Sequence, residues 1–448
     1  MNLFRLFATG PDRPLLESQQ KIDQLYKRHR MRIMLAITLG YGVVYTCRLA
    51  LSVVKKPLID GGIFSADELG MIGAALFYTY AFGKLTNGFL ADHANLKIFF
   101  AAGVLISALI NIWMGFSTIL WLSILLWGLN GWFQGFGAPA GIVAIASWFS
   151  NRERGRTYGI WSTAHSIGEG LTFIGVAGLV TLWGWRAGFW GPGVLCILVA
   201  LGLLIFMQDR PQTMGLPSVA DWKNDHWTGG SEEQEERNIW ASQRSILKIP
   251  AIWVLAMSSA AIYVTRYAIN SWGILYLQEA KGFSLMEAGG MLTANTITGI
   301  LGALAYGFAS DKLFKARRPP VNLIFGLLEI AGLLLIFFGP PGRPGLMLIA
   351  FLLYGFGLTG LVTALGGLFA VDIAPKKAAG AAMGFIGVFS YLAAATQDRI
   401  SGYLIEQGTT LVDGVRIYDF SQAISFWVGS SVVSLILSTT LWRVQLRD

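Results

Sequence analysis

The chain has 448 residues, of which 54% are hydrophobic and only 13% are charged. Soluble domains carry about 25% charged residues, so this composition excludes an ordinary soluble domain and indicates a membrane protein. The formal net charge is +8. The basic residues are spread over alternate loops between apolar segments, so we interpret them as a topology signal and expect no nucleic-acid partner.

Twelve apolar windows follow one another along the chain, each near the length of about 20 residues that crosses the hydrocarbon core of a bilayer. They lie near residues 31–53, 68–90, 97–117, 119–148, 156–181, 187–208, 250–278, 285–310, 321–340, 344–371, 379–404 and 420–442. Helices satisfy every backbone polar group within their own segment, so the pattern predicts an all-α protein of twelve transmembrane helices.

One long polar stretch, residues 209–249, interrupts the apolar windows and predicts a cytoplasmic linker. It divides the chain into an N-terminal six-helix bundle over 31–208 and a C-terminal six-helix bundle over 250–442. Its acidic run, Glu232-Glu233-Gln234-Glu235-Glu236, indicates a solvated tether, and the alternative is a partner-binding segment.

Basic residues set the expected orientation. They gather in residues 1–30, in alternate loops and in the tail 443–448. The remaining loops hold few basic residues, and Lys55 and Lys56 are expected to be two of these. Positive loops stay in the cytoplasm, so both termini are expected there.

The two halves repeat each other. Gly88-Phe89-Leu90-Ala91-Asp92 recurs as Gly307-Phe308-Ala309-Ser310-Asp311, and Arg48 and Arg266 are separated by nearly the same number of residues as these two motifs. A charged side chain at the centre of a membrane helix costs about 2.5–3.5 kcal/mol on insertion scales and is rarely there without a role. Two arginines related by the repeat therefore predict a central anion site, and the alternative for each is snorkelling to the nearer interface.

Several segments carry a family resemblance. The six-plus-six arrangement and the motifs ending at Asp92 and Asp311 resemble the major facilitator superfamily. Within this superfamily, the chain most resembles the organophosphate:phosphate antiporter family. The segments that carry this resemblance are 40–48, 131–135, 164–168, 263–272 and 374–380. Segments 209–212, 215–217 and 310–314 most resemble its bacterial hexose-phosphate sensor branch. The resemblance implies that the chain spans a bacterial inner membrane.

The resemblance implies roles for the motif residues. Arg48 and Arg266 would bind the phosphoryl group, and a guanidinium matches a phosphate bidentately. The resemblance also implies that Lys84 and His165 contribute to the substrate-binding site. Lys84 could instead form an ion pair with a residue of another helix, and His165 could be a packing residue.

The aromatic residues of these helices could contact the organic part of the substrate or could simply pack. They are Tyr41, Tyr45, Trp161, Tyr263 and Trp272. Asp92 and Asp311 are interpreted as a cytoplasmic latch between the halves, and the alternative is substrate contact.

The chain also departs from the family pattern. Leu49 stands where the family usually has a lysine, and Thr296 lies near the place of a common glutamate. Glu169 replaces a typical glycine and shares a helix face with His165. Asp398 and Arg399, inside an apolar window, could neutralise each other, although adjacent residues point to different faces of a helix. Glu169, Asp398 and Arg399 are therefore candidates for coupling or specificity.

These observations lead to one prediction and one alternative. We expect a monomeric secondary transporter that exchanges a sugar phosphate, such as a hexose 6-phosphate, or another organophosphate for inorganic phosphate by alternating access. Obligate exchange follows if the empty, doubly positive site resists closure. The alternative is a membrane sensor of external sugar phosphate that acts through a kinase partner. No enzyme activity, cofactor or metal is expected, since no nucleophile–base motif or metal-ligand spacing is found.

Overall fold

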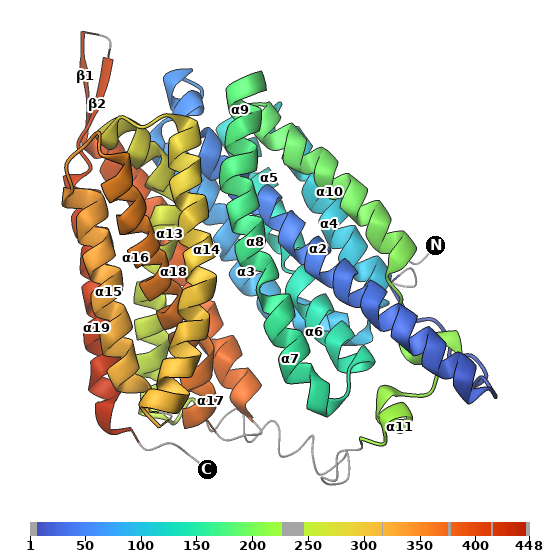
Figure 1. Cartoon of the computed structure of the whole chain (residues 1–448). Helices are drawn as coiled ribbons and strands as arrows, with labels where there is room; N and C mark the ends of the chain where they lie inside the picture. The colour runs from blue at the N-terminus through green and yellow to red at the C-terminus, as the bar shows by residue number, and fades with distance from the viewer. Residues whose placement is uncertain (1–6, 226–245, 316, 375–377, 414, 445–448) are drawn as a thin grey trace.

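The computed structural model describes residues 7–225, 246–315, 317–374, 378–413 and 415–444, and it is built almost entirely from helices (Figure 1). Its first half contains α2 (Gln19–Asp60), α3 (Ala66–His93), α4 (Leu96–Met114), α5 (Leu120–Gln134), α6 (Gly137–Trp148), α7 (Asn151–Ser162), α8 (Ala164–Leu171), the π-helix η1 (Thr172–Val176), α9 (Ala177–Trp183) and α10 (Ala187–Phe206). The polar stretch after α10 holds a short 3-10 helix, η2 (Pro211–Met214), and α11 (Val219–Lys223).

The second half repeats this pattern. It contains α13 (Pro250–Lys281), α14 (Leu285–Phe308), the π-helix η3 (Ala309–Leu313), α15 (Arg318–Phe338), α16 (Pro344–Thr363), the π-helix η4 (Ala364–Leu368), α17 (Phe369–Ile373), α18 (Ala379–Gln407), α19 (Ser421–Thr440) and the 3-10 helix η6 (Leu441–Arg443). Between α18 and α19 an antiparallel hairpin of β1 (Thr409–Val412) and β2 (Val415–Tyr418) projects from the bundle (Figure 1).

Ten helical segments of the described chain are long and apolar enough to cross a membrane. The other two predicted spans are α3 and the pair α5–α6. Helix α3 is less apolar, and α5–α6 is interrupted between Gln134 and Gly137. Both pack inside the bundle, α5 against α3 and α3 against α18. The prediction of a twelve-helix membrane fold in two six-helix bundles is confirmed.

The repeat extends to the helix starts. Ser65 caps α3 in a capping box with Glu68, and Ser284 caps α14 in a capping box with Glu287. In both, the serine hydroxyl accepts a backbone N–H of the first turn and the glutamate accepts the serine N–H. The corresponding helix of each half therefore begins in the same way.

The halves meet along three helix pairs: α2 with α13, α3 with α18, and α8 with α14. Within the first half, Gly42 of α2 and Gly168 of α8 bring these helices very close. A Cβ atom on Gly168 would lie only 2.0 Å from the carbonyl oxygen of Gly42. This approach fixes the position of α8 relative to Arg48, two turns further along α2.

The first half also anchors the start of the linker. The Trp222 ring of α11 stacks on the Tyr26 ring with centroids 4.0 Å apart, and its Nε1 donates to Asp23. The Tyr26 hydroxyl donates to the carbonyl of Pro217 at 2.6 Å. The acidic run over 232–236 lies outside the described residues.

Candidate substrate-binding site

Arg48 is buried in the middle of the bundle. It is 3% exposed, its Nε donates to Gln134 Oε1 at 2.9 Å, and its Nη1 donates to the Tyr45 hydroxyl at 3.2 Å. Its guanidinium carbon also lies 4.5 Å from the ring centroid of Tyr45 and 4.1 Å from that of Tyr80. The side chain does not snorkel to an interface, and every partner that holds it among the described residues is neutral.

Gln134 holds Arg48 through a polar network within the first half. Its Nε2 donates to Asn130 Oδ1 at 3.0 Å and to Ser107 Oγ at 3.2 Å, which leaves Oε1 free to accept from Arg48. Asn130 in turn donates to the carbonyl of Cys47 at 3.0 Å, next to Arg48 in the chain. The network orients the amide of Gln134, and the motif around Gln134 was the available sequence signal for it.

Arg266 has a different environment, because an acid lies beside it. Its Nη2 is 2.7 Å from Glu169 Oε1, and the two side chains are 12% and 6% exposed. Arg266 comes from α13 in the second half and Glu169 from α8 in the first, so the ion pair joins the halves. The expectation of two free positive charges is therefore corrected: Arg266 has a counter-ion within the protein.

Tyrosine rings from both halves fill the space between the two arginines. The Tyr80 and Tyr391 ring centroids are 4.6 Å apart, and Tyr391 lies 6.2 Å from Tyr267. The Arg266 guanidinium carbon is 5.6 Å from the Tyr267 centroid. Tyr80, Tyr267 and Tyr391 were missed from the sequence. Tyr80 precedes Lys84 by one helical turn, which was a usable signal for a shared face.

A cavity of about 440 Å³ lies beside this aromatic cluster. Its lining includes Tyr41, Tyr80, Lys84, Asp92, Trp161, His165 and Tyr391. The arginines do not line it, since the rings of Tyr41, Tyr80 and Tyr391 stand in the wall. The lining continues to Asp92 at the end of α3, so the cavity extends toward the end of the bundle where α2 begins and α19 ends, which we name the terminal face.

Lys84 and His165 both reach this cavity. The Lys84 Nζ lies 5.0 Å from the Tyr391 ring centroid, and no acid of the described chain lies within ion-pair distance of it. The predicted alternative, an inter-helix ion pair of Lys84, is therefore not formed here. His165 Nδ1 is 2.5 Å from the carbonyl oxygen of Ser162, and its ring lies 6.0 Å from that of Tyr45.

The other predicted aromatic residues are divided between two places. Tyr41 and Trp161 lie in the cavity wall with ring centroids 4.9 Å apart. Tyr263 is 5.8 Å from the Arg266 guanidinium, on the aromatic cluster. Trp272 is fully buried on the other side of the arginines, with the Lys55 ammonium 3.2 Å from its ring centroid. The structure therefore separates Trp272 from the cavity.

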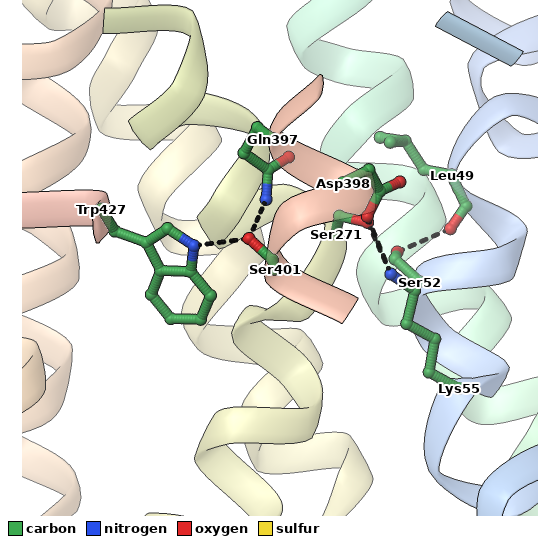
Figure 2. Close-up of polar contacts among 8 residues, drawn as sticks. All are labelled: Leu49, Ser52, Lys55, Ser271, Gln397, Asp398, Ser401 and Trp427. Atoms are coloured by element: carbon green, nitrogen blue, oxygen red, sulfur yellow. Dashed lines mark hydrogen bonds and ion pairs between the residues drawn. The ribbon is translucent and has the colours of Figure 1, made fainter. Parts of the chain in front are cut away.

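Lys55 closes the bundle on the side away from the terminal face, which we name the distal face. Its Nζ donates to Ser271 Oγ at 2.7 Å and lies 3.2 Å from Asp398 Oδ1, with both side chains of the ion pair almost fully buried (Figure 2). The expectation that Lys55 lies in a loop is wrong, because α2 continues to Asp60 and buries Lys55 within the helix.

The expected self-neutralised pair of Asp398 and Arg399 is also wrong. Asp398 pairs with Lys55, whereas Arg399 pairs with Asp67 at the start of α3. Adjacent residues of a helix point in different directions, so each of these side chains reaches a different element of the first half. Lys56 adds another contact across the halves, to Glu279.

The latch expected of Asp92 and Asp311 does not join the halves in this conformation. Asp311 Oδ1 lies 3.0 Å from Arg318 Nη1, and Arg318 also pairs with Asp372 at 2.7 Å. All three belong to the second half. Asp92 forms no ion pair within the described residues and lines the cavity. The molecule is thus held together at the distal face while the cavity extends to the terminal face.

Comparison with known proteins agrees with this architecture. Residues 33–396 match the Major Facilitator Superfamily. The chain is 35% identical over 395 residues to the membrane sensor protein UhpC of Escherichia coli, covering 87% of this chain and 89% of that protein. It is 34% identical to a probable hexose phosphate transport protein of Chlamydia pneumoniae, covering 88% and 89% of the two chains. It is 30% identical to the glycerol-3-phosphate transporter of Bacillus subtilis, covering 98% of each.

Solved structures show the same fold. A bacterial homologue of the human lysosomal transporter Spinster, in its inward-facing and unoccupied conformation, superposes with a TM-score of 0.73 at 17% identity, covering 93% of this chain and 96% of that one. The chain belongs to the major facilitator superfamily and, within it, to the organophosphate:phosphate antiporter family.

Proposed function

We propose that this protein is a secondary transporter that exchanges an organophosphate, such as a hexose 6-phosphate, for inorganic phosphate across a bacterial inner membrane. The observation that carries the proposal is Arg48, a buried guanidinium held by neutral partners only. A buried charge is costly unless it is paired, so this position is built for a ligand of opposite charge. The relatives named as hexose phosphate and glycerol-3-phosphate transporters supply the substrate class.

The substrate phosphoryl group would lie between Arg48 and Arg266, with its organic part against the tyrosines. Lys84 and His165, on the cavity wall, would meet the anion as it enters. Reaching Arg48 requires the rings of Tyr80 and Tyr391 to move, because both stand between it and the cavity. Ring rotation of this kind allows the site to close behind a bound anion.

Alternating access follows from the contacts across the halves. The Lys55–Asp398 and Arg399–Asp67 pairs hold the distal face shut, and they would break when the halves rock apart there. With basic loops in the cytoplasm, the terminal face is the cytoplasmic one. The described conformation would then be open to the inside.

A second candidate function rests on the relative UhpC, whose name is that of a membrane sensor. A sensor would bind the same anion at the same arginines and signal through a kinase partner, with little flux. Both functions need Arg48, so its burial favours neither.

Proteoliposomes separate the two. Labelled phosphate uptake is measured into vesicles loaded with phosphate, glucose 6-phosphate, glycerol 3-phosphate or buffer alone. Uptake that is faster into loaded vesicles supports the transporter, and binding of an organophosphate without uptake supports the sensor. Neither binding nor uptake of any phosphate compound would refute both.

A further inference from the structure

Glu169 forms an ion pair with Arg266, one of the two arginines proposed above to bind the phosphoryl group. Its Oε1 accepts from Arg266 Nη2 at 2.7 Å, a typical length for a charge-assisted hydrogen bond to carboxylate or phosphate oxygen. No other carboxylate of the described chain lies within ion-pair distance of Arg266. Arg48, the symmetry-related arginine, has neutral partners instead. The two halves of the anion site therefore differ in charge when no substrate is bound.

The helix around Glu169 holds this carboxylate in place. Gly168, one residue before it, abuts Gly42 of α2, and a turn at Thr163 and the π-helix η1 interrupt the segment on either side. Interruptions of this kind are common at functional sites. The packing of Gly168 fixes α8 against α2, and the Thr293 hydroxyl of α14 donates to the carbonyl oxygen of Gly170 at 3.0 Å, so Glu169 lies where α8 meets the second half.

The groups that interact electrostatically with Glu169 come from four helices. They are Arg266 and Tyr263 of α13, Tyr45 of α2, His165 of α8 and Tyr354 of α16, and Arg48 in turn acts on His165. In the empty protein the charge of Arg266 is cancelled by Glu169, and Arg48 keeps its own. A phosphate group that arrives at both guanidinium groups would compete with Glu169 for Arg266 Nη2.

We propose that Glu169 is a built-in counter-anion that stands in for substrate at Arg266, so that the empty protein can also reorient. The proposal rests on the proposed transport function and goes beyond exchange: the chain would also carry out net movement of phosphate or an organophosphate, with no anion travelling in the opposite direction. A site with two unpaired buried cations would resist closing, whereas a site with one cation neutralised closes at lower cost. Glu169 would thus set the balance between exchange and net transport.

The test compares two fluxes in the same proteoliposomes, with the membrane potential clamped by potassium and valinomycin. Exchange is labelled phosphate uptake into phosphate-loaded vesicles, and net transport is uptake into vesicles that contain only gluconate. The wild type is expected to show net transport well above protein-free vesicles. In Glu169→Gln, the ratio of net transport to exchange is expected to fall at least about tenfold, a factor equivalent to 1.4 kcal/mol. Glu169→Asp, which keeps the carboxylate, is expected to restore part of the ratio.

Phosphate affinity distinguishes this role from a purely structural one, because the loss of a structural ion pair would not tighten phosphate binding. Without its internal competitor, Glu169→Gln is expected to bind inorganic phosphate about tenfold more tightly in titration calorimetry. Loss of a structural contact alone would lower the melting temperature and leave phosphate binding equal or weaker. If Glu169→Gln unfolds, its melting curve will show this. The phosphate affinity and the flux ratio of Glu169→Asp are then compared with those of the wild type.

The outcomes are distinguishable. Exchange without net transport in the wild type would overturn the counter-anion proposal and leave the transporter standing. So would an unchanged flux ratio in Glu169→Gln together with unchanged phosphate affinity. Absence of both fluxes in the wild type would refute the proposed transport function, and with it this inference.

Discussion

Lys55 and Asp398 form a buried ion pair across the two halves, with Nζ and Oδ1 3.2 Å apart and the Trp272 ring packed on the ammonium group. A glycine makes this possible, since a Cβ on Gly73 would lie 1.9 Å from a carboxylate oxygen of Asp398. The chain thus leaves a space in α3 for a side chain of α18. The Lys55–Asp398 pair is thus one of three ion pairs that join the halves at the distal face, together with Arg399–Asp67 and Lys56–Glu279.

We predict that breaking this pair on one side destabilises the protein more than removing it altogether. Asp398→Asn leaves the Lys55 charge buried without its acid, which costs about 3–5 kcal/mol. The double variant Lys55→Met with Asp398→Leu removes both charges and should recover most of that loss. Melting temperatures in detergent measure the difference. A double variant less stable than Asp398→Asn would contradict the prediction.

The same double variant should shift the molecule toward opening at the distal face. Spin labels on the distal loops, at Ile63 and Val412, are expected to show a longer distance distribution than in the unsubstituted background. Arg186→Met is the matched control, because Arg186 is a distal residue that stacks on Trp185 and joins no ion pair within the described residues. An unaltered distribution in the double variant would mean that other contacts hold this face shut.

Arg48→Lys should abolish most substrate binding although it keeps the charge. A lysine lacks the planar fork and cannot reproduce the contacts with both Gln134 and Tyr45. Removing one partner of a buried, hydrogen-bonded charge contact costs about 2–5 kcal/mol, so we expect kcat/KM for exchange to fall at least about thirtyfold. Arg32→Lys, earlier in the same helix, serves as the control and should retain exchange. Near-normal exchange in Arg48→Lys would place the phosphate elsewhere.

Tyr80 should contribute through its ring rather than its hydroxyl group. The ring centroid lies 4.1 Å from the Arg48 guanidinium carbon. Cation–π contacts contribute about 0.5–2 kcal/mol, so Tyr80→Leu is expected to weaken phosphate binding by about 2- to 30-fold. Tyr80→Phe keeps the ring and should bind within about twofold of the wild type. If both variants bind equally weakly in calorimetry, the hydroxyl group is the functional part.

Gly168→Ala should destabilise the protein, although alanine is the better helix former. The added Cβ would lie 2.0 Å from the Gly42 carbonyl oxygen, so α2 and α8 must separate. Overpacking of this kind costs about 1–3 kcal/mol. Gly159→Ala, on the neighbouring α7, adds a Cβ with no atom within 4 Å and should leave stability unchanged or slightly higher. Equal melting temperatures for the two variants would show that the close approach tolerates a methyl group.

Several features could be predicted from the sequence because they depend on local composition and on repetition. Apolar windows of membrane length fix the number of helices, since lipid leaves the backbone no other way to satisfy its polar groups. Arg48 and Arg266 stand out for a similar reason, because a charge within an apolar window is conspicuous in any sequence. Their role in phosphate binding stays a prediction until it is measured.

The tertiary structure decided which charges meet. Glu169 lies 97 residues from Arg266 in the chain, and Asp398 lies 343 residues from Lys55. No local spacing connects residues that far apart, and Lys55 was mistaken for a loop residue because a lysine near a helix end is normally solvated. Only the packing of one half against the other brings these carboxylates to their cations. Burial then makes each contact costly to break on one side only, because a buried charge left without its partner destabilises the protein by about 3–5 kcal/mol.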